Sequence, residues 1–138
     1  MQHTDLPPIT ITSLDLERLL RLLETEAVQS LPGSEMLQEE LSRAHVVSPE
    51  EIGPEFVTMN STVRFVEEGA YKAYQLKLVY PDEAGTPGTV SIFAPVGSAL
   101  LGLSVGQVIK WPAPGGRRLS LKIVSVVEQP ESQQQYHL

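Results

Sequence analysis

The fold of this chain is decided by residues 71–80, which read Tyr-Lys-Ala-Tyr-Gln-Leu-Lys-Leu-Val-Tyr. The alternation places Tyr74, Leu76 and Leu78 on one face of an extended strand. A strand with one apolar face needs neighbouring strands to cover its edges and a core to cover that face. The stretch therefore predicts a sheet, whose other strands have to come from the flanking sequence.

Further strands are predicted on both sides of this stretch. The candidates are residues 56–66, 89–93, 107–111 and 119–127. Turns rich in Pro and Gly separate them, and residues 97–102 enclose a single helical turn. Several short strands separated by turns indicate an antiparallel sheet or half-barrel with one short helix.

Helical periodicity replaces this alternation near the start of the chain. Thr12 and Asp15 are spaced as a capping pair, and an apolar stripe follows at Leu16, Leu19, Leu20, Leu23 and Ala27. After a break at residues 31–34, a second stripe consists of Leu37, Leu41 and Ala44. Two amphipathic helices joined by a short loop predict an antiparallel hairpin, a short coiled coil. Its first helix of about 16 residues would span roughly 24 Å.

These patterns divide an α+β chain into five segments. We expect a flexible arm at residues 1–11, the helical hairpin at 12–47, a linker at 48–55, the β domain at 56–128 and a tail at 129–138. The linker combines proline, glycine and glutamate, which favour turns over regular structure.

Composition excludes several functional classes. The chain has no cysteine, which excludes disulfides and thiolate chemistry. A net charge of −7 disfavours stable direct binding to nucleic acid, because phosphate contact needs a cationic face. The start of the chain has no signal-peptide pattern, and no apolar run reaches membrane length, so we expect a cytoplasmic protein without membrane contact. His3, His45 and His137 are too scattered for a metal site. We therefore expect no metal, no cofactor and no catalytic residue, and hence no enzyme.

An ordered set of motifs resembles a known family. The set is Asn-Ser-Thr-Val at 60–63, Val-Tyr-Pro-Asp-Glu-Ala at 79–84, Ser-Ile-Phe-Ala-Pro-Val-Gly-Ser-Ala-Leu-Leu-Gly at 91–102, Val-Gly-Gln at 105–107 and Pro-Gly-Gly at 114–116. It resembles the C-terminal domain of the transcript-cleavage factors GreA and GreB. The preceding hairpin is also arranged as in that family, so the resemblance covers about residues 12–128. It implies an FKBP-like fold for the second domain, an antiparallel sheet wrapped on a short helix.

Within the family, the chain most resembles a subgroup named for the regulation of nucleoside diphosphate kinase. Its hairpin is distinctly shorter than in GreA or GreB. Ser-Pro-Glu-Glu at 48–51, followed by Val-Thr-Met-Asn-Ser at 57–61, resembles the junction of that subgroup, and Gln-Pro-Glu at 129–131 resembles its tail.

The resemblance implies docking on RNA polymerase. Gre-type proteins bind the rim of the polymerase secondary channel with the C-terminal domain and insert the hairpin. The docking residues would be Pro95, Val96, Gly97 and Ser98, in the loop entering the short helix. The alternative is that Pro95 and Gly97 only shape a turn, with Leu100 and Leu101 in the core. We expect a monomeric regulator that occupies the channel and competes with Gre factors.

The hairpin tip predicts binding without transcript cleavage. Cleavage needs two carboxylates there, to hold a metal ion and orient a water. The predicted tip is Leu31, Pro32, Gly33, Ser34 and Glu35, and residues 29–34 contain no acid. Glu26 and Glu35 flank the tip, and Glu35 either complements the positive end of a helix or, with Glu26, supplies metal ligands.

Other residues and functions leave alternatives open. Arg18 and Arg21, one helical turn apart, would face the channel or nascent RNA, or would form a solvated face with Glu17 and Glu24. Asp82 and Glu83 either bind a cation or belong to a solvated loop. Besides a polymerase-binding regulator, the resemblance leaves open a prolyl isomerase or chaperone, which needs an aromatic-lined pocket near Trp111, and a direct regulator of nucleoside diphosphate kinase.

Overall fold

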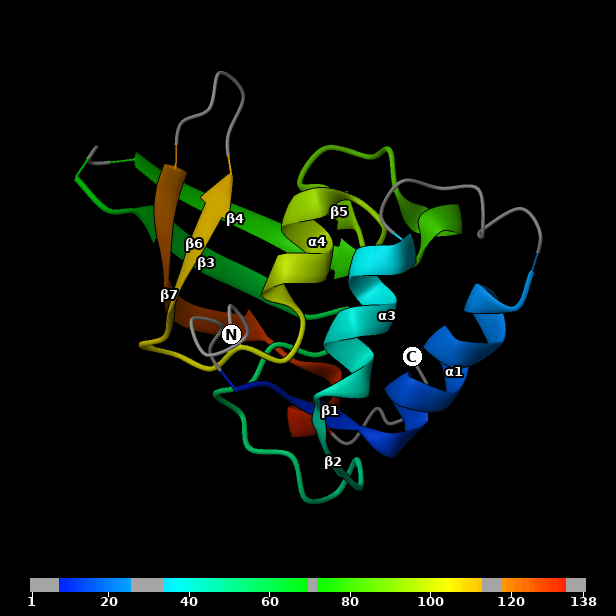
Figure 1. Cartoon of the computed structure of the whole chain (residues 1–138). Coiled ribbons are helices and arrows are strands. Elements are labelled where there is room, and N and C mark those ends of the chain that lie inside the picture. Colours follow the sequence, from blue (N-terminus) through cyan, green and yellow to red (C-terminus); the bar gives the residue numbers. More distant parts are fainter. Residues whose placement is uncertain (1–7, 26–33, 70–71, 113–117, 134–138) are drawn as a thin grey trace.

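A five-stranded sheet organises the second half of the chain in a computed structural model that describes residues 8–25, 34–69, 72–112 and 118–133 (Figure 1). Its strands are β3 (Thr62–Glu67), β4 (Lys72–Val79), β5 (Thr89–Ser91), β6 (Val108–Pro112) and β7 (Arg118–Glu128). They lie in the order β5-β4-β3-β7-β6. The predicted strand at residues 71–80 is confirmed as β4, and its alternation holds: Leu78 is buried, Tyr74 and Leu76 are half-buried, and Lys77 is exposed.

One edge of this sheet differs from the expected antiparallel arrangement. β5 runs parallel to β4, with Thr89 beside Lys77 and Ser91 beside Val79. The residues between β4 and β5 include the 3-10 helix η2 (Pro81–Glu83). They carry the chain back along the edge of β4 before β5 pairs with it. Such a return lets two strands run in the same direction, whereas a tight hairpin turn could not.

The first strand of the sheet begins at Thr62, six residues later than expected. Phe56 forms only an isolated antiparallel bridge with Ser104. Residues 58–61 form a turn, in which the backbone N–H of Ser61 donates to the carbonyl of Thr58 at 3.1 Å. Asn60 has a positive φ of 67°, a conformation that asparagine tolerates better than most residues. The backbone N–H of Asn60 donates to the carbonyl of Leu78 at 2.6 Å, which holds the turn against β4.

Two helices lie in front of the sheet in Figure 1, namely α3 (Ser34–Ser42) and α4 (Pro95–Leu100). One cluster of buried apolar side chains joins both helices to the strands, and it includes Leu37, Leu41, Val63, Leu100, Leu101 and Ile123. Burial of each such side chain contributes about 1.5–3 kcal/mol. Leu100 and Leu101 are therefore core residues, as one interpretation of the sequence held.

A small second sheet joins the two ends of the helical segment. β1 (Thr10–Thr12) pairs in parallel with β2 (His45–Val47), residue 10 beside residue 45 and residue 12 beside residue 47. Ile9 and Ile11 are buried in the core, although they fall within the expected arm. β2 occupies the last residues of the segment expected to be a helical hairpin. The backbone N–H of Thr10 also donates to the carbonyl of Gly102 at 3.1 Å, which ties β1 to the end of α4.

The end of the described chain is also anchored. Residue Gln129 precedes the 3-10 helix η4 (Pro130–Gln133) and is buried. Its side-chain amide donates to the carbonyls of Gly53 and Phe56, both at 2.9 Å. The first five residues of the expected tail are therefore held against the predicted linker.

Helix α1 (Ser13–Leu23) begins at the predicted cap. The backbone N–H of Asp15 donates to the hydroxyl of Thr12 at 3.0 Å. Leu19 and Leu23 are buried as the stripe predicted, but Leu20 is 46% exposed. The buried face instead includes Asp15, which lies four residues before Leu19. The exposed fraction of Asp15 is 3%. The packed side of the helix therefore carries an acid as well as leucines of the predicted stripe.

Replacing Thr12 by alanine tests the cap. We expect Thr12→Ala to lower the free energy of unfolding by about 1 kcal/mol, because a buried backbone N–H loses its acceptor. Thr12→Ser keeps the hydroxyl and loses the same methyl group, so it should be clearly less destabilised in urea denaturation. Equal losses in the two variants would mean that the methyl group, and not the cap, carries the effect.

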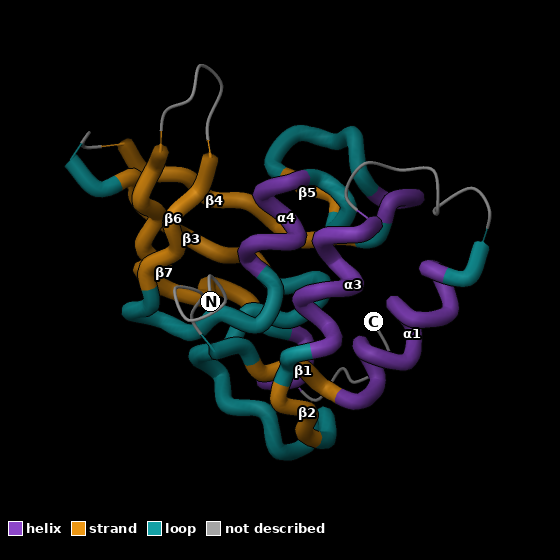
Figure 2. Tube along the Cα trace, in the orientation of Figure 1, coloured by secondary structure: helices purple, strands orange, loops and turns teal. Residues whose placement is uncertain are grey.

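The described part of α1 has 11 residues, about 16 Å of helix, compared with the 16 residues expected. In Figure 2, α1 leads away from β1, and α3 leads back to β2. Their connection falls in residues 26–33, outside the described residues, so the hairpin and its coiled coil stay predictions. Among the described residues, no helix has the length and apolar character needed to cross a membrane.

Candidate functional site

The predicted docking loop forms the first turn of α4. Val96 is half-buried and packs against the core, while Gly97 and Ser98 are buried. The hydroxyl of Ser98 donates to the sulfur of Met36 in α3 at 3.2 Å. The side chain of Pro95 lies outside the described part of the structure. Of the described side chains in this loop, Val96 is the one that retains exposed surface, and docking through it stays a prediction.

Gly97 has a packing role of its own. A Cβ atom at this position would lie 2.0 Å from the carbonyl oxygen of Ser91 in β5. Only a residue without a side chain lets the backbone of α4 approach β5 this closely. This contact supports the alternative that Gly97 shapes the fold.

The predicted hairpin tip is described in part. Ser34 and Glu35 form the first residues of α3, where Ser34 is buried and Glu35 is exposed. A negative charge in the first turn complements the positive end of the helix dipole. Leu31, Pro32, Gly33 and Glu26 lie outside the described residues, so the prediction for the tip stays untested.

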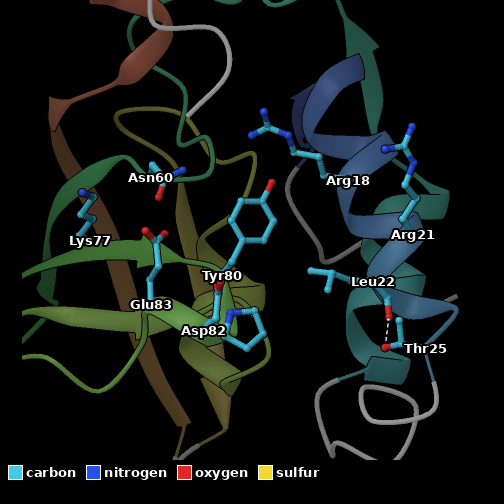
Figure 3. A pocket seen from close by; sticks show the side chains of 10 residues that line it. Arg18, Arg21, Leu22, Thr25, Asn60, Lys77, Tyr80, Asp82 and Glu83 are labelled. Atoms are coloured by element: carbon cyan, nitrogen blue, oxygen red, sulfur yellow. Dashed lines mark hydrogen bonds between the residues drawn. The ribbon is translucent and has the colours of Figure 1, made fainter.

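A cavity of about 830 Å³ separates α1 from the end of β4 and from η2 (Figure 3). Arg18 and Arg21 lie on the α1 side, and Lys77 and Tyr80 lie on the opposite side. The other lining residues are Leu22, Thr25, Asn60, Pro81, Asp82 and Glu83. We refer to this cavity as the α1–η2 groove. The structure thus brings the predicted arginine pair together with the Asp82-Glu83 acids, which the sequence had given no reason to associate.

The two arginines differ in their surroundings. Arg21 forms an ion pair with Glu17, with its guanidinium nitrogen 3.0 Å from the carboxylate oxygen. Both side chains are largely exposed, at 72% and 61%, and such pairs contribute little to stability. Arg18 is half-buried, and its guanidinium lies near the hydroxyl of Tyr80 (Figure 3). Burial, together with the charges of Asp15 and Glu131, raises the pKa of Tyr80, and Arg18 opposes that increase.

A buried carboxyl group ties α1 to the β domain behind this groove. The Asp15 carboxylate accepts the backbone N–H of Met59 at 3.1 Å. Burial raises the pKa of Asp15 to about 7, Glu131 acts in the same direction, and the Met59 hydrogen bond opposes it. Glu131 is itself held by the hydroxyl of Thr58 at 2.7 Å. The turn at residues 58–61 therefore connects α1 with η4.

The described residues also bear on metal binding and on the prolyl isomerase alternative. Within residues 8–25, 34–69, 72–112 and 118–133, no three His, Cys, Asp or Glu side chains are grouped to hold a metal ion. Tyr80 supplies the one aromatic ring of the α1–η2 groove, whereas a prolyl isomerase needs an aromatic-lined pocket. The side chain of Trp111 lies outside the described part, so the isomerase alternative stays a prediction.

Sequence reasoning missed Asp15, Asn60, Lys77 and Tyr80 as site residues. A signal existed for Asp15, because residues 15, 19 and 23 share one helix face and two of them are leucines. The other three gave no such signal, because the groove forms only when α1 packs beside the end of β4.

Comparisons with known proteins identify the class to which this fold belongs. Residues 41–128 match the family model described as "Transcription elongation factor, GreA/GreB, C-term", and residues 7–47 match "Rnk N-terminus". The chain therefore belongs to the GreA/GreB family of transcription factors. Within that family it is similar to the "Regulator of nucleoside diphosphate kinase" of Escherichia coli strain K12, with 43% identity over 96% of this chain and 98% of that protein.

Two further relatives place the chain in the family. A solved structure titled "Prokaryotic transcription elongation factor GreA/GreB from Nitrosomonas europaea" has 54% sequence identity and a TM-score of 0.73, over 88% of this chain and 99% of that one. The "Transcription elongation factor GreA" of Thermodesulfovibrio yellowstonii is 35% identical over 65% of this chain and 57% of its own length. The resemblance to the kinase-regulator subgroup is thus confirmed, as is the mixed α+β fold.

Proposed function

We propose that this chain is a transcription regulator that binds RNA polymerase at the rim of the secondary channel and competes there with Gre factors, without stimulating transcript cleavage. Its place of action would be the bacterial cytoplasm. The proposal includes an FKBP-like β domain as the docking part and α1 with α3 as a short hairpin facing the channel.

The observation that carries the proposal is the similarity to a GreA/GreB structure over nearly its whole length. The alignment covers 99% of the Nitrosomonas europaea chain at 54% identity. It includes the helical segment as well as the β domain, since 88% of this chain is matched. A shared arrangement of both parts supports a shared binding surface on a common partner.

The packing of α1 supports binding without cleavage. Leu19 and Leu23 lie in the same buried cluster as Val63 and Ile123 of the sheet. A helix whose apolar face packs against the core of its own protein is held close to that core. With about 16 Å of described helix and no acid in residues 29–34, the segment is poorly suited to deliver two carboxylates into a distant active site.

The direct test is a competition experiment on a backtracked polymerase complex. The complex is mixed with this protein, with GreB or with both, while RNA cleavage and polymerase binding are followed. We expect this protein to bind, to leave the RNA uncleaved and to suppress GreB-stimulated cleavage in proportion to its concentration. Cleavage stimulated by this protein alone would contradict the proposed lack of cleavage, and absence of binding would overturn the polymerase proposal altogether.

A matched pair of variants locates the binding surface. Val96→Asp adds a charge to the docking turn, and Val124→Asp adds the same charge to a 42%-exposed valine of β7. If Val96 contacts the polymerase rim, Val96→Asp should weaken binding by at least about tenfold, as for burial of an unpaired charge at an interface. Val124→Asp should leave binding unchanged, and far-UV circular dichroism should show both variants folded.

A second candidate function is direct control of nucleoside diphosphate kinase. The name of the Escherichia coli relative, 43% identical over nearly the whole chain, is the observation that favours it. The purified kinase serves as an additional partner in the binding assay. Binding to the kinase but not to polymerase would favour this second candidate over the first.

A further inference from the structure

The α1–η2 groove has the size and shape of a small-molecule site. Its volume of about 830 Å³ falls within the range of roughly 300–1,000 Å³ usual for ligand pockets. Hydrogen bonds fix α1, which forms one wall, and the end of β4, which forms the other. The Asp15 carboxylate holds α1 to Met59 at 3.1 Å, and Asn60 donates to Leu78 at 2.6 Å. The groove therefore exists before any ligand enters.

The charge of the groove is opposite to that of the protein. Three lining residues are basic and two are acidic, which gives a formal charge of +1 in a chain of net charge −7. The cations come from both walls, because Arg18 and Arg21 belong to α1 and Lys77 belongs to β4 (Figure 3). Cationic side chains on both walls of one cavity favour an anion with several oxygens, such as a di- or triphosphate.

At least two of these cations are able to turn toward such a ligand. Lys77 is an exposed side chain on a strand whose backbone is fixed by pairing with β3 and β5. Arg21 is engaged with Glu17, but that pair is exposed on both sides and so costs little to exchange for a phosphate. Exchange of a weak surface ion pair for a charged hydrogen bond to phosphate is favourable.

The rest of the lining fits a base better than a bare phosphate. Leu22 and Pro81 provide apolar surface, and the Tyr80 ring stands between the two walls (Figure 3). A flat heterocycle binds well to such a ring. Asp82 and Glu83 add two exposed carboxylates, which accept hydrogen bonds from the ring and amino N–H groups that purine bases present. These acids would repel an anion that lacked such donors.

We propose that the α1–η2 groove binds a purine nucleoside di- or triphosphate. The phosphates contact Arg18, Arg21 and Lys77, and the base lies against Tyr80 with its N–H groups toward Asp82 or Glu83. This site is separate from the docking turn at Val96, and its occupancy is measurable without polymerase.

The test is isothermal titration of the full-length chain with GDP, GTP, ADP, ATP and pyrophosphate. We expect nucleotides to bind and pyrophosphate to bind more weakly. Arg21→Glu and Lys77→Glu should each weaken nucleotide binding by at least about tenfold, as for loss of one charged hydrogen bond. Lys72→Glu is the matched control, because it makes the same charge change at the other end of β4 and should leave binding unchanged.

A second variant tests recognition of the base separately from recognition of the phosphates. Asp82→Asn should change the preference between guanine and adenine nucleotides and leave pyrophosphate binding as it was. Four outcomes would overturn the proposal: no nucleotide binding, equal binding of pyrophosphate and nucleotides, equal losses for Lys72→Glu and Lys77→Glu, or tighter binding of a ten-residue oligoribonucleotide than of any mononucleotide. The last result would identify the groove as an RNA contact instead.

Discussion

The wild-type protein should lose about 4 kcal/mol of folding stability between pH 4 and pH 8 relative to an Asp15→Asn variant. Asp15 is buried at the junction of α1 with the turn at residues 58–61, and its pKa is raised from 3.8 to about 7. A shift of one pKa unit corresponds to about 1.4 kcal/mol, so a shift of about three units gives this magnitude.

The sign follows from proton binding. Between pH 3.8 and about 7 the folded state keeps a proton on Asp15 that the unfolded state releases. Stability from this group is therefore fully present below pH 3.8 and is lost as the pH rises through 7. Burial is the main cause, and the neighbouring charge of Glu131 adds to it. Asparagine has nearly the same shape and no charge, and it keeps an oxygen to accept the N–H of Met59.

Urea denaturation at half-unit pH steps measures the effect. The difference between wild type and Asp15→Asn should be largest at pH 8, where the variant is expected to be the more stable protein. Asp82→Asn serves as the control, because it makes the same chemical change at an exposed position in η2. Parallel curves for wild type and Asp15→Asn would show that the carboxyl group is ionised in the folded state throughout this range.

Gly97→Ala is expected to lower the free energy of unfolding by about 3 kcal/mol through overpacking. The new Cβ atom would stand 2.0 Å from the carbonyl oxygen of Ser91 and 2.9 Å from its carbonyl carbon. Both atoms belong to the backbone of β5, so no side chain can rotate away and α4 itself has to move. Helix propensity alone predicts the opposite sign, a gain of about 1 kcal/mol. The experiment therefore distinguishes packing from propensity.

Gly53→Ala provides the control for this substitution. There the three atoms nearest to the new methyl group all belong to the carboxylate end of Glu55, which is flexible and able to move. Thermal or chemical unfolding should show at most a small change for Gly53→Ala. If both variants lose the same stability, the close approach of α4 to β5 does not limit the residue at position 97.

Local patterns in the sequence predicted those parts of the fold that depend on neighbouring residues. The alternation at 71–80 gave β4 and its buried face, and the Thr12-Asp15 spacing gave the start of α1. Leu100 and Leu101 were predicted as core residues by their position in a short helical turn between strands. In each case the side chains that produce the pattern lie within four residues of one another.

Features that depend on distant contacts were not predictable in this way. β1 and β2 pair over three residues that are 35 positions apart, and each is too short to show a period. Asp15 meets a backbone N–H 44 residues away, and nothing near it in sequence indicates that partner. The α1–η2 groove combines residues 18–25 with Asn60 and residues 77–83, so no single stretch of sequence reveals it.

The β1–β2 pair has a consequence for how this family can vary. The helical segment leaves the body after Thr12 and returns at His45, and three backbone pairings hold these two points side by side. Loop closure is thus completed at the base, and each doubling of the length between the two points costs only about 0.6 kcal/mol. Leu19, Leu23, Leu37 and Leu41 keep both helices packed on the sheet, so the length that can vary lies between these buried residues of α1 and α3. Insertions or deletions there would change the reach of the segment and leave its packed base in place.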